Sequence, residues 1–380
     1  MIMPIAQNKI IVSSKLNSDD WEGSFSSTEC TLHQISPYLG KIKSAFAKKL
    51  ITTYSKPFDT ILDPFAGSGT VALEALIAKR HVIANDINPY AVTLTNAKLN
   101  PPSSLTKATK KVQEYIIESK IHSKKIDLEE VPLWVKKFYN EETLREILSL
   151  CKIFHENDEF FLTSCLLGIL HHERPGFLSY PSSHLSPYLR TKKYPPELFP
   201  QLYTYRDVES RLIRKLNRTF RRSPKIDKKL KKSCTQKNAE CLDIPEDTVN
   251  AIISSPPYMN TLDYARDNRL RLWFLGIDDF KRFDRASPKN LGEFQCLMTN
   301  VMENLYPALK KNGYCVFVLG DVKTTNKPIN TALTVLEIAE KIGNFQCEGF
   351  ISDEVPHLRR IRKECNCTKT EWIVALKKLR

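Results

Sequence analysis

The segment LDPFAGSGT, Leu62–Thr70, has residue types and spacing that suit the binding of a small ligand through the main chain. It closes a short apolar run that is typical of a buried strand. Gly67 and Gly69 let the backbone turn tightly and let a ligand approach the peptide groups. No Gly-Lys-Ser/Thr follows, so the turn is not a phosphate loop. The Asp-Pro-Phe prefix makes it more specific than the Gly-x-Gly pattern that many nucleotide-binding folds share.

A second acid, Asp86 in ANDINPY, ends the next apolar run. An acid about twenty residues after a glycine turn is placed to accept hydrogen bonds from both hydroxyls of a ribose. The alternative is an ordinary strand–helix turn followed by an exposed loop acid. The paired spacing favours a site for a ligand that contains a nucleoside.

A third chemical segment is SSPPYMNTLDY, Ser254–Tyr264, which again follows an apolar run. Two consecutive prolines stiffen the turn and fix the direction of their carbonyls. The neighbouring tyrosine offers a flat face on which a base can stack. A hydroxyl, a carbonyl and an aromatic ring at one strand end suit an extruded base. Taken alone, the segment is better interpreted as a proline-rich loop with a core tyrosine.

Together, DPFAGSGT and SPPY resemble the amino-group DNA methyltransferases, which make N6-methyladenine and N4-methylcytosine. The resemblance implies S-adenosylmethionine as the methyl donor. HQISPYLGKIK, His33–Lys43, resembles the family's additional cofactor-binding segment, and the acid in AECLDIP resembles the group that binds the cofactor's adenine amine. The cofactor-binding residues implied in this way are Pro37, Tyr38, Lys41, Asp63, Pro64, Phe65, Ala66, Gly67, Ser68, Gly69, Thr70, Asp86, Ile87, Asp243 and Ser254.

The resemblance also implies a mechanism. An exocyclic amine is a poor nucleophile because its lone pair is delocalised into the ring. The Ser255 hydroxyl and the Pro256 carbonyl would accept its N–H bonds and aim its lone pair at the sulfonium methyl, beside Pro257, while Tyr258 stacks on the base. The methyl group then moves in one in-line displacement, with positioning supplying much of the rate. The chain has no Pro-Cys dipeptide, which excludes the cytosine C5 methyltransferases.

The target base is predicted from one residue. In the family, serine before PPY leans toward cytosine N4, whereas aspartate or asparagine leans toward adenine N6. Ser255 therefore favours cytosine in DNA, and adenine remains the alternative.

Between the two motifs lies a long segment, residues 101–237, in the position where the family places its target-recognition domain. It contains the densest cationic stretch of the chain, and four of its cations fall on one helical face. The residues expected to contact DNA are Arg174, Ser182, Ser183, His184, Arg211, Arg214, Lys215 and Arg218, with Arg359 and Arg360 in a second basic loop. The alternative is a solvated basic helix or linker. HHE, His171–Glu173, lacks the spacing of helical zinc sites, so no metal is expected.

The fold expected is α/β: a Rossmann-like S-adenosylmethionine methyltransferase sheet, mostly parallel, with a terminal antiparallel hairpin and a largely helical inserted target-recognition domain. Alternating strands and helices between Thr60 and Leu99 carry this prediction, and the pattern resumes with strands expected at Ala239–Leu242 and Val249–Ser254. The predicted divisions are residues 1–100 and 238–380 for the catalytic domain and 101–237 for the insertion.

Charge and composition bound the partners. The chain has 380 residues and a net charge of +14, which favours a polyanion but does not separate DNA from RNA or an anionic membrane. No apolar run is long enough to span a membrane, and MIMPIAQNKIIVSSK lacks the order of a secretory signal. Ten cysteines without a framework spacing predict reduced thiols and a cytoplasmic protein.

Double-stranded DNA is the expected partner, in a restriction–modification system or as a stand-alone mark. A cognate restriction endonuclease is expected to act separately, without a stable complex, and the enzyme to be a monomer or weak dimer. Two further alternatives stay open: an RNA amino-group methyltransferase, which shares both turns, and a catalytically silent DNA-binding subunit. Both turns are intact, which disfavours the silent subunit.

Overall fold

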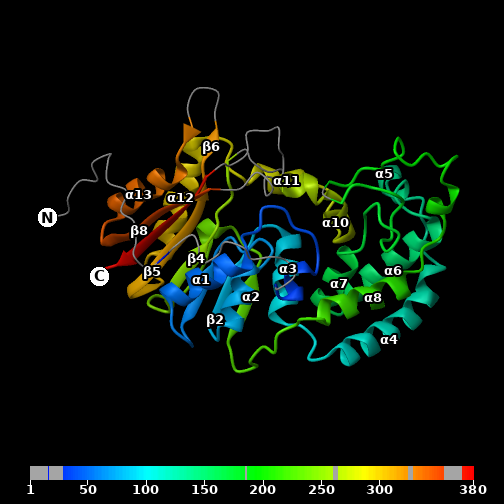
Figure 1. Ribbon diagram of the computed structural model, residues 1–380, viewed down its shortest axis with the longest axis horizontal. Helices are drawn as coiled ribbons and strands as arrows, with labels where there is room; N and C mark the ends of the chain where they lie inside the picture. Colours follow the sequence, from blue (N-terminus) through cyan, green and yellow to red (C-terminus); the bar gives the residue numbers. More distant parts are fainter. Residues whose placement is uncertain (1–15, 17–28, 185, 260–263, 324–327, 355–369) are drawn as a thin grey trace.

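A seven-stranded sheet runs through the computed structural model, which describes residues 16, 29–184, 186–259, 264–323, 328–354 and 370–380 (Figure 1). Its strand order is β3-β2-β1-β4-β5-β9-β8. The strands are β1 Thr60–Asp63, β2 His81–Asn85, β3 Lys232–Thr235, β4 Val249–Ser254, β5 Leu309–Gly320, β8 Phe345–Glu354 and β9 Thr370–Lys378. Only β9 is antiparallel to its neighbours β5 and β8. The mostly parallel sheet with its closing antiparallel hairpin is thus confirmed.

Helices cover both faces of the sheet because its strands are apolar on both sides. Ile61 packs with α1 and α2 on one face, whereas Leu62 packs with α12 and α13 on the other. This alternation follows from the two-residue period of a strand. The helices are α1 Ser44–Tyr54, α2 Thr70–Ile77, α3 Pro89–Leu99, α12 Leu291–Leu305 and α13 Thr331–Ile342.

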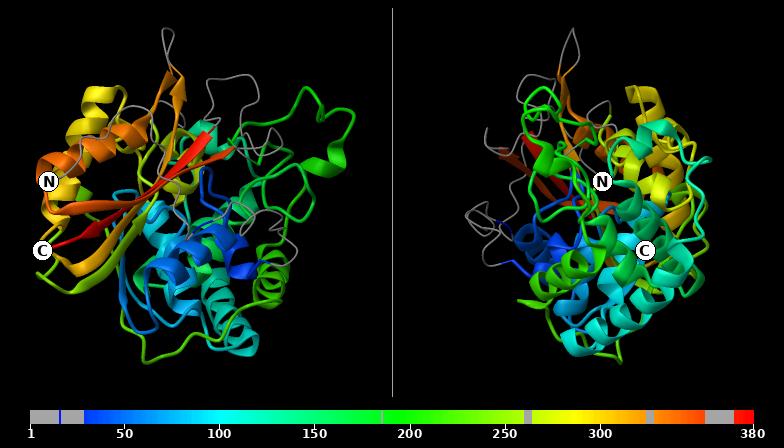
Figure 2. Two further views of the ribbon diagram at one scale, coloured as in Figure 1. Left: turned by 60° about the vertical axis from the view of Figure 1, so that its left-hand side comes forward. Right: turned by 90° about the vertical axis from the view of Figure 1, so that its right-hand side faces the viewer.

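A helical body lies beside the sheet, against α3 (Figures 1 and 2). Its elements are α4 Leu105–Ser123, α5 Leu133–Lys136, α6 Glu141–Glu156, α7 Phe160–Leu167, η3 Pro200–Tyr203 and α8 Val208–Phe220. Apart from η3, which has no buried residue, these elements share one core with Tyr90 and Leu94 of α3 and with Leu270 and Phe274 of α10, Arg269–Phe274. The insertion is therefore helical, as predicted, and its core is continuous with the catalytic half.

Several short elements lie near the carboxyl edge of the sheet. They are η2 Thr31–Gln34, η4 Ala239–Cys241, α9 Tyr264–Asp267, α10 Arg269–Phe274, α11 Lys281–Arg285, β6 Val322–Lys323 and β7 Pro328–Ile329. Within the described residues, no helix is both long and apolar enough to cross a bilayer.

One predicted strand is wrong. The segment Ala239–Leu242 begins as a 3₁₀ turn, and the strand that pairs with β2 is β3, Lys232–Thr235. Ala239 and Leu242 are buried, and apolar residues at these positions led to the prediction of a strand. β3 was not recognised because it is a short sheet edge, KSCT, with no apolar run. After the insertion, the sheet therefore resumes at Lys232, before the predicted boundary at residue 238.

Gly69 should be the least replaceable residue of the turn after β1. Its φ is +71°, and an added Cβ would lie 2.7 Å from Thr95 Oγ1 and 2.9 Å from Thr95 Cα of α3. We expect Gly69→Ala to lower the free energy of unfolding by about 2–4 kcal/mol, from backbone strain plus overpacking. Denaturant unfolding measures this change.

Gly276→Ala is the matched control, since that glycine has a φ of +77° but open space around the added Cβ. It should cost only the strain of about 1–2 kcal/mol. Equal losses in the two variants would show that the contact with α3 is unimportant.

Candidate active site

The turn after β1 is held by the acid at the end of β2. Gly67, with φ +52°, donates its N–H to Asp86 Oδ2 at 2.8 Å, and Asn88 N donates to Asp86 Oδ1 at 2.9 Å. Each carboxylate oxygen has capacity for a further hydrogen bond, so the hydroxyls of a ribose can still be accepted. Asp86 therefore lies at the glycine turn, and its predicted contact with ribose hydroxyls stays a prediction.

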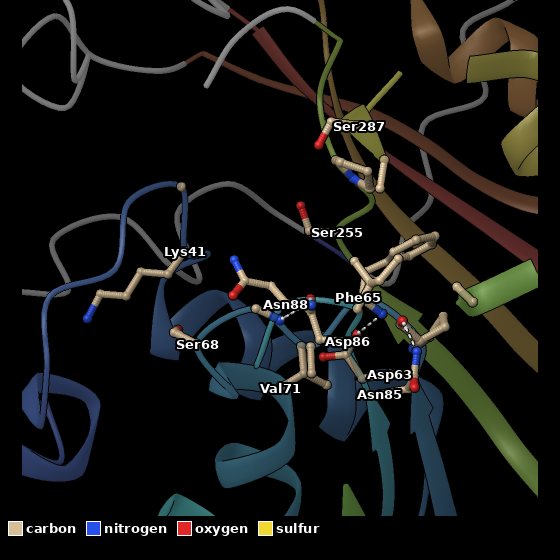
Figure 3. Close-up of a pocket in the computed structure, with 18 of the residues that line it drawn as sticks. Lys41, Asp63, Phe65, Ser68, Val71, Asn85, Asp86, Asn88, Ser255 and Ser287 are labelled. Atoms are coloured by element: carbon tan, nitrogen blue, oxygen red, sulfur yellow. Dashed lines mark hydrogen bonds between the residues drawn. The ribbon is translucent and has the colours of Figure 1, made fainter. Parts of the chain in front are cut away.

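These residues line a pocket of about 230 Å³ at the carboxyl ends of β1, β2 and β4. Figure 3 shows Asp63, Asp86 and Asn88 on one side of it and Ser255 and Ser287 on the other. The expected residues that line it are Tyr38, Lys41, Asp63, Pro64, Phe65, Ala66, Gly67, Ser68, Thr70, Asp86, Ile87, Ser255 and Pro257. Ligands of open α/β sheets bind at this edge.

Two carboxyls give the pocket its electrostatic character. Burial is the main cause that raises the pKa of Asp63 to about 7, against hydrogen bonds from Ser254 and Phe65 that favour the charged form. Burial likewise raises the pKa of Asp86 to about 6, opposed by the backbone N–H groups of Asn88 and Gly67. A cationic ligand would favour both carboxylates as anions. This fits a donor that carries a positively charged sulfonium.

Two turns meet at the pocket through one side-chain hydrogen bond. We call Asp63–Gly69, after β1, the donor turn and Ser254–Tyr258, after β4, the catalytic turn. Ser254 Oγ donates to Asp63 Oδ1 at 2.6 Å, and both side chains are buried. The contact arises because β4 pairs in parallel with β1, so their carboxyl ends lie side by side. Ser255 and Pro257 then face the pocket, whereas Pro256 is buried.

Tyr258 completes a short relay behind Ser255. Ser255 Oγ donates to Tyr258 OH at 3.4 Å, and Tyr258 OH donates to Glu371 Oε1 of β9 at 3.3 Å. A serine that donates backward keeps its lone pairs as acceptors for another group. Glu371 was not foreseen, because its contact depends on the antiparallel position of β9 beside β5.

The segment before α1 closes another side of the pocket. Tyr38 lies against Gly67, whose added Cβ would meet its ring at 3.4 Å. Pro37 does not line the pocket; its carbonyl accepts a hydrogen bond from Tyr90 OH at 2.6 Å. The Lys41 amine points away from Asp86 in Figure 3 and donates to His33 O at 2.9 Å. The positive end of Lys41 therefore stabilises the segment and does not enter the pocket.

A buried polar cluster lies under the donor turn and was not predicted from the sequence. Lys98 Nζ of α3 donates to Ser68 O, and burial lowers the pKa of Lys98 to about 7. Nearby, His33 Nε2 and Glu74 Oε1 are 2.7 Å apart, and burial raises the pKa of Glu74 to about 7. The available signal was polar residues among the apolar positions of two helices, which does not by itself indicate a partner.

The assignment of Asp243 to the cofactor pocket is corrected. Its side chain is exposed, and it does not line the pocket. Asn238, Ala239 and Glu240 line it instead, because the chain turns inward at η4. The Glu240 carboxylate accepts hydrogen bonds from Asn238 Nδ2 at 2.9 Å and Asn300 Nδ2 at 2.7 Å. Phe283, Ala286, Ser287 and Leu297, also absent from the sequence prediction, form a further wall.

The residues expected to contact DNA divide by exposure. Arg174, His184, Arg214 and Arg218 are exposed, and Arg211 is half-buried. Ser182, Ser183 and Lys215 are buried, and Lys215 Nζ donates to Gln34 O at 2.8 Å. These three are corrected to structural roles. Helical periodicity cannot tell that Lys215 lies on the face of α8 that packs on η2, and Ser182 and Ser183 are buried in a loop, where they pair with Ser179 and His171. Arg359 and Arg360 lie outside the described residues.

The described residues contain no group of three or more His, Cys, Asp or Glu able to hold a metal.

Asp86→Asn should weaken binding of S-adenosylmethionine by on the order of tenfold to a hundredfold, the value of a hydrogen bond to a charged group. The wild-type advantage should grow as pH rises through the pKa of about 6, because the ionised carboxylate is the stronger acceptor. Calorimetric titration between pH 5 and 8 measures both effects.

Asp59→Asn is the matched control, since Asp59 caps the opposite end of β1 by accepting the Lys56 N–H at 2.7 Å. It should bind the donor as the wild type does. Unchanged affinity in Asp86→Asn would remove Asp86 from the ribose site.

Comparison with known proteins agrees with this geometry. A family model described as DNA methylase, of the N6/N4 type, matches residues 21–97, which contain Tyr38, the glycine turn and Asp86. Type II methyltransferase M.MvaI of Kocuria varians is 24% identical over 328 residues, which covers 79% of this chain and 71% of the relative.

Solved structures overlap more loosely. TrmN from Thermus thermophilus has 11% identity and a TM-score of 0.37, covering 92% of this chain and 52% of its own, so this chain spans about half of TrmN. A SAM-dependent methyltransferase from Methanosarcina mazei has 10% identity and a TM-score of 0.36, covering 87% and 97%. The fold assignment rests on the strand order described above. The chain is thus similar to DNA methylases of the N6/N4 type over residues 21–97 and to a Type II methyltransferase over most of its length, its glycine turn and SPPY turn lie at one pocket, and S-adenosylmethionine is its cofactor.

Proposed function

We propose that this DNA methyltransferase transfers a methyl group to the exocyclic N4 amine of cytosine in double-stranded DNA. One observation carries the proposal: Ser255 of the SPPY turn lines the same pocket as Asp63, Gly67 and Asp86 of the donor site. A pocket at the edge of the sheet cannot reach a base inside a duplex, so the target base must be extruded.

The residues of the chain act by positioning. Ser255 Oγ, which donates toward Tyr258, offers its lone pairs to one amine N–H, and the Pro256 carbonyl offers a second acceptor. The hydrogen bond from Tyr258 OH to Glu371 orients that relay, and such chains polarise each other. S-adenosylmethionine, when bound, would supply a sulfonium methyl: the new N–C bond would replace the S–C bond, S-adenosylhomocysteine would leave, and the proton lost by the amine would pass to solvent.

Cytosine is proposed over adenine because a serine precedes PPY in this chain. Ser255 has one side-chain oxygen, and it already donates its hydrogen to Tyr258. Adenine N6 is the alternative target, and the same geometry would serve it.

Arg214 and Arg218 of the insertion are the proposed contact with the DNA backbone, and we call this pair the cationic ridge. Both residues are exposed on α8. Burial lowers the pKa of Arg218, and the nearby charges of Arg214, Arg174 and Arg221 lower it further. Clustered like charges are costly unless a polyanion relieves them. Next to the ridge, the rings of His172 and His184 stack with centroids 4.9 Å apart.

The ridge is joined to the donor site. Thr31 Oγ1 donates to Thr219 O at 2.6 Å, and Lys215 binds Gln34 O, so α8 rests on the segment that leads to Tyr38. Arginines that bind phosphate would thereby have a fixed position relative to the pocket. We propose that the enzyme acts as a monomer or weak dimer in the cytoplasm. A restriction–modification role, with a separate nuclease, is proposed from the Type II name of its relative.

The identity of the product tests the proposed function. Purified protein is incubated with unmethylated genomic DNA and isotope-labelled S-adenosylmethionine, and the nucleosides are separated by mass spectrometry. We expect labelled N4-methylcytosine from the wild type and a loss of on the order of a hundredfold in turnover for Ser255→Ala, with donor affinity nearly unchanged.

Labelled N6-methyladenine would keep the mechanism and overturn the choice of base. Label found only in RNA offered in a parallel reaction would contradict the DNA substrate. Absence of label from both would contradict catalysis and favour a silent DNA-binding subunit.

The cationic ridge predicts a change in salt dependence. Each phosphate contact contributes about 0.9 to the slope of log affinity against log salt, so Arg214→Ala and Arg218→Ala should each flatten it by about that amount. Fluorescence anisotropy of a DNA duplex at several salt concentrations gives the slope.

Lys110→Ala is the control, because Lys110 is an exposed cation of α4 that lies 3.9 Å from Glu114. Its slope should match the wild type. Equal flattening in all three variants would mean that net charge, and not the ridge, attracts the DNA.

A further inference from the structure

The helix that follows the catalytic turn is fixed by an acid from another element. Only residues 259–263 separate Tyr258 from α9, Tyr264–Asp267. Ala265 N donates to Asp284 Oδ1 at 2.8 Å, and Arg266 N donates to Asp284 Oδ2 at 3.1 Å. The first N–H groups of a helix have no partner within it, so Asp284 caps α9 from α11.

The element that carries Asp284 is also a wall of the donor pocket. Its neighbour Phe283 lines the pocket, as do Ala286 and Ser287 just beyond α11. Asp284 therefore stands between two surfaces. On one side is the pocket that binds the donor, and on the other is the start of the helix that continues the catalytic turn.

The far end of α9 contacts the insertion. Ser186 Oγ donates to Asp267 Oδ1, and Arg269 donates to Pro187 O. Immediately beyond, the buried Arg271 donates to Leu167 O at the end of α7. Segments near the cationic ridge thus reach α9 and α10 through direct hydrogen bonds.

Arg271 extends this path to the donor segment. Its guanidinium lies 5.7 Å from the centroid of the Tyr90 ring, and Tyr90 OH donates to Pro37 O next to Tyr38. The guanidinium is almost fully buried, so its neighbours have little freedom to rearrange independently. The insertion and the segment that leads to Tyr38 are therefore both linked to one short stretch, residues 264–271.

We infer that Asp284 is a positioning residue that couples donor binding to DNA binding by holding α9, which contacts the insertion, against α11, which forms a wall of the donor pocket. A ligand that packs against Phe283 and Ser287 fixes α11, and the two hydrogen bonds of Asp284 pass that constraint to α9. Coupling between two ligands is reciprocal, so DNA held by the insertion must favour donor binding by the same factor. This inference rests on the proposed function.

The test measures coupling and rate in Asp284→Asn and Asp284→Ala. Affinity for a methylatable DNA duplex is measured by anisotropy with and without saturating S-adenosylhomocysteine, and affinity for S-adenosylhomocysteine alone by calorimetry. We expect the wild type to bind DNA at least about fivefold more tightly with the analogue. Asp284→Ala should abolish that ratio and slow single-turnover methylation by on the order of tenfold to a hundredfold.

Each separate affinity should change by less than about twofold, which a merely structural defect would not achieve. Asp284→Asn keeps one acceptor oxygen and should be intermediate; it also serves if the alanine variant does not fold. Asp279→Asn is the matched control, since Asp279 lies just before α11 in an exposed pair with Arg285 at 2.8 Å. It should retain wild-type coupling.

Several results would overturn the inference: no coupling in the wild type, wild-type coupling and rate in both Asp284 variants, or a loss of donor affinity as large as the loss of rate. If the wild type transfers no label to DNA, the proposed function fails and the inference falls with it. If the wild type methylates DNA and the Asp284 variants match it, only the inference fails.

Discussion

The hydrogen bond from Ser254 Oγ to Asp63 Oδ1 is the constraint on which the active site depends. The donor turn begins at Asp63 and the catalytic turn at Ser254, and these residues are far apart in the sequence. The parallel pairing of β1 with β4 brings the two strand ends together, and the 2.6 Å bond fixes their side chains in a buried environment. Burial also raises the pKa of Asp63 to about 7. Without a ligand, the carboxyl that accepts this bond is therefore only partly ionised near neutral pH. A cationic donor beside it would complete the electrostatic balance.

The insertion is more closely integrated with this centre than an appended recognition module would be. Its helices share a core with α3, which carries Tyr90 and, at its end, Lys98 under the glycine turn. It meets the donor segment again where Lys215 binds Gln34 O. If DNA binds this body as proposed, any displacement of the body would also displace α3, η2 or α9. Packed interiors transmit such shifts because they have few voids to absorb them.

The sequence predicted what is local, and it missed what depends on tertiary pairing. The glycine turn, Asp86 and the SPPY turn each follow an apolar run within a few residues, so their positions at strand ends could be foreseen. β3 could not, because a polar edge strand has no apolar signature. Lys215 was assigned to a DNA-facing stripe, yet the stripe of α8 that packs on η2 includes it. Asp243 failed because the chain turns inward before it, at η4. Glu371 and Asp284 act through partners more than a dozen residues away, which periodicity does not encode.

Single-turnover methyl transfer by Ser254→Ala tests most directly whether the donor turn and the catalytic turn work as one site. Enzyme preloaded with labelled S-adenosylmethionine is mixed with excess DNA, and Ser233→Ala on the exposed edge strand β3 serves as the matched control. We expect a rate lowered by on the order of tenfold or more in Ser254→Ala, with the donor still bound and the control unchanged. A wild-type rate in Ser254→Ala would show that the two turns keep their alignment without this bond, and would contradict the account.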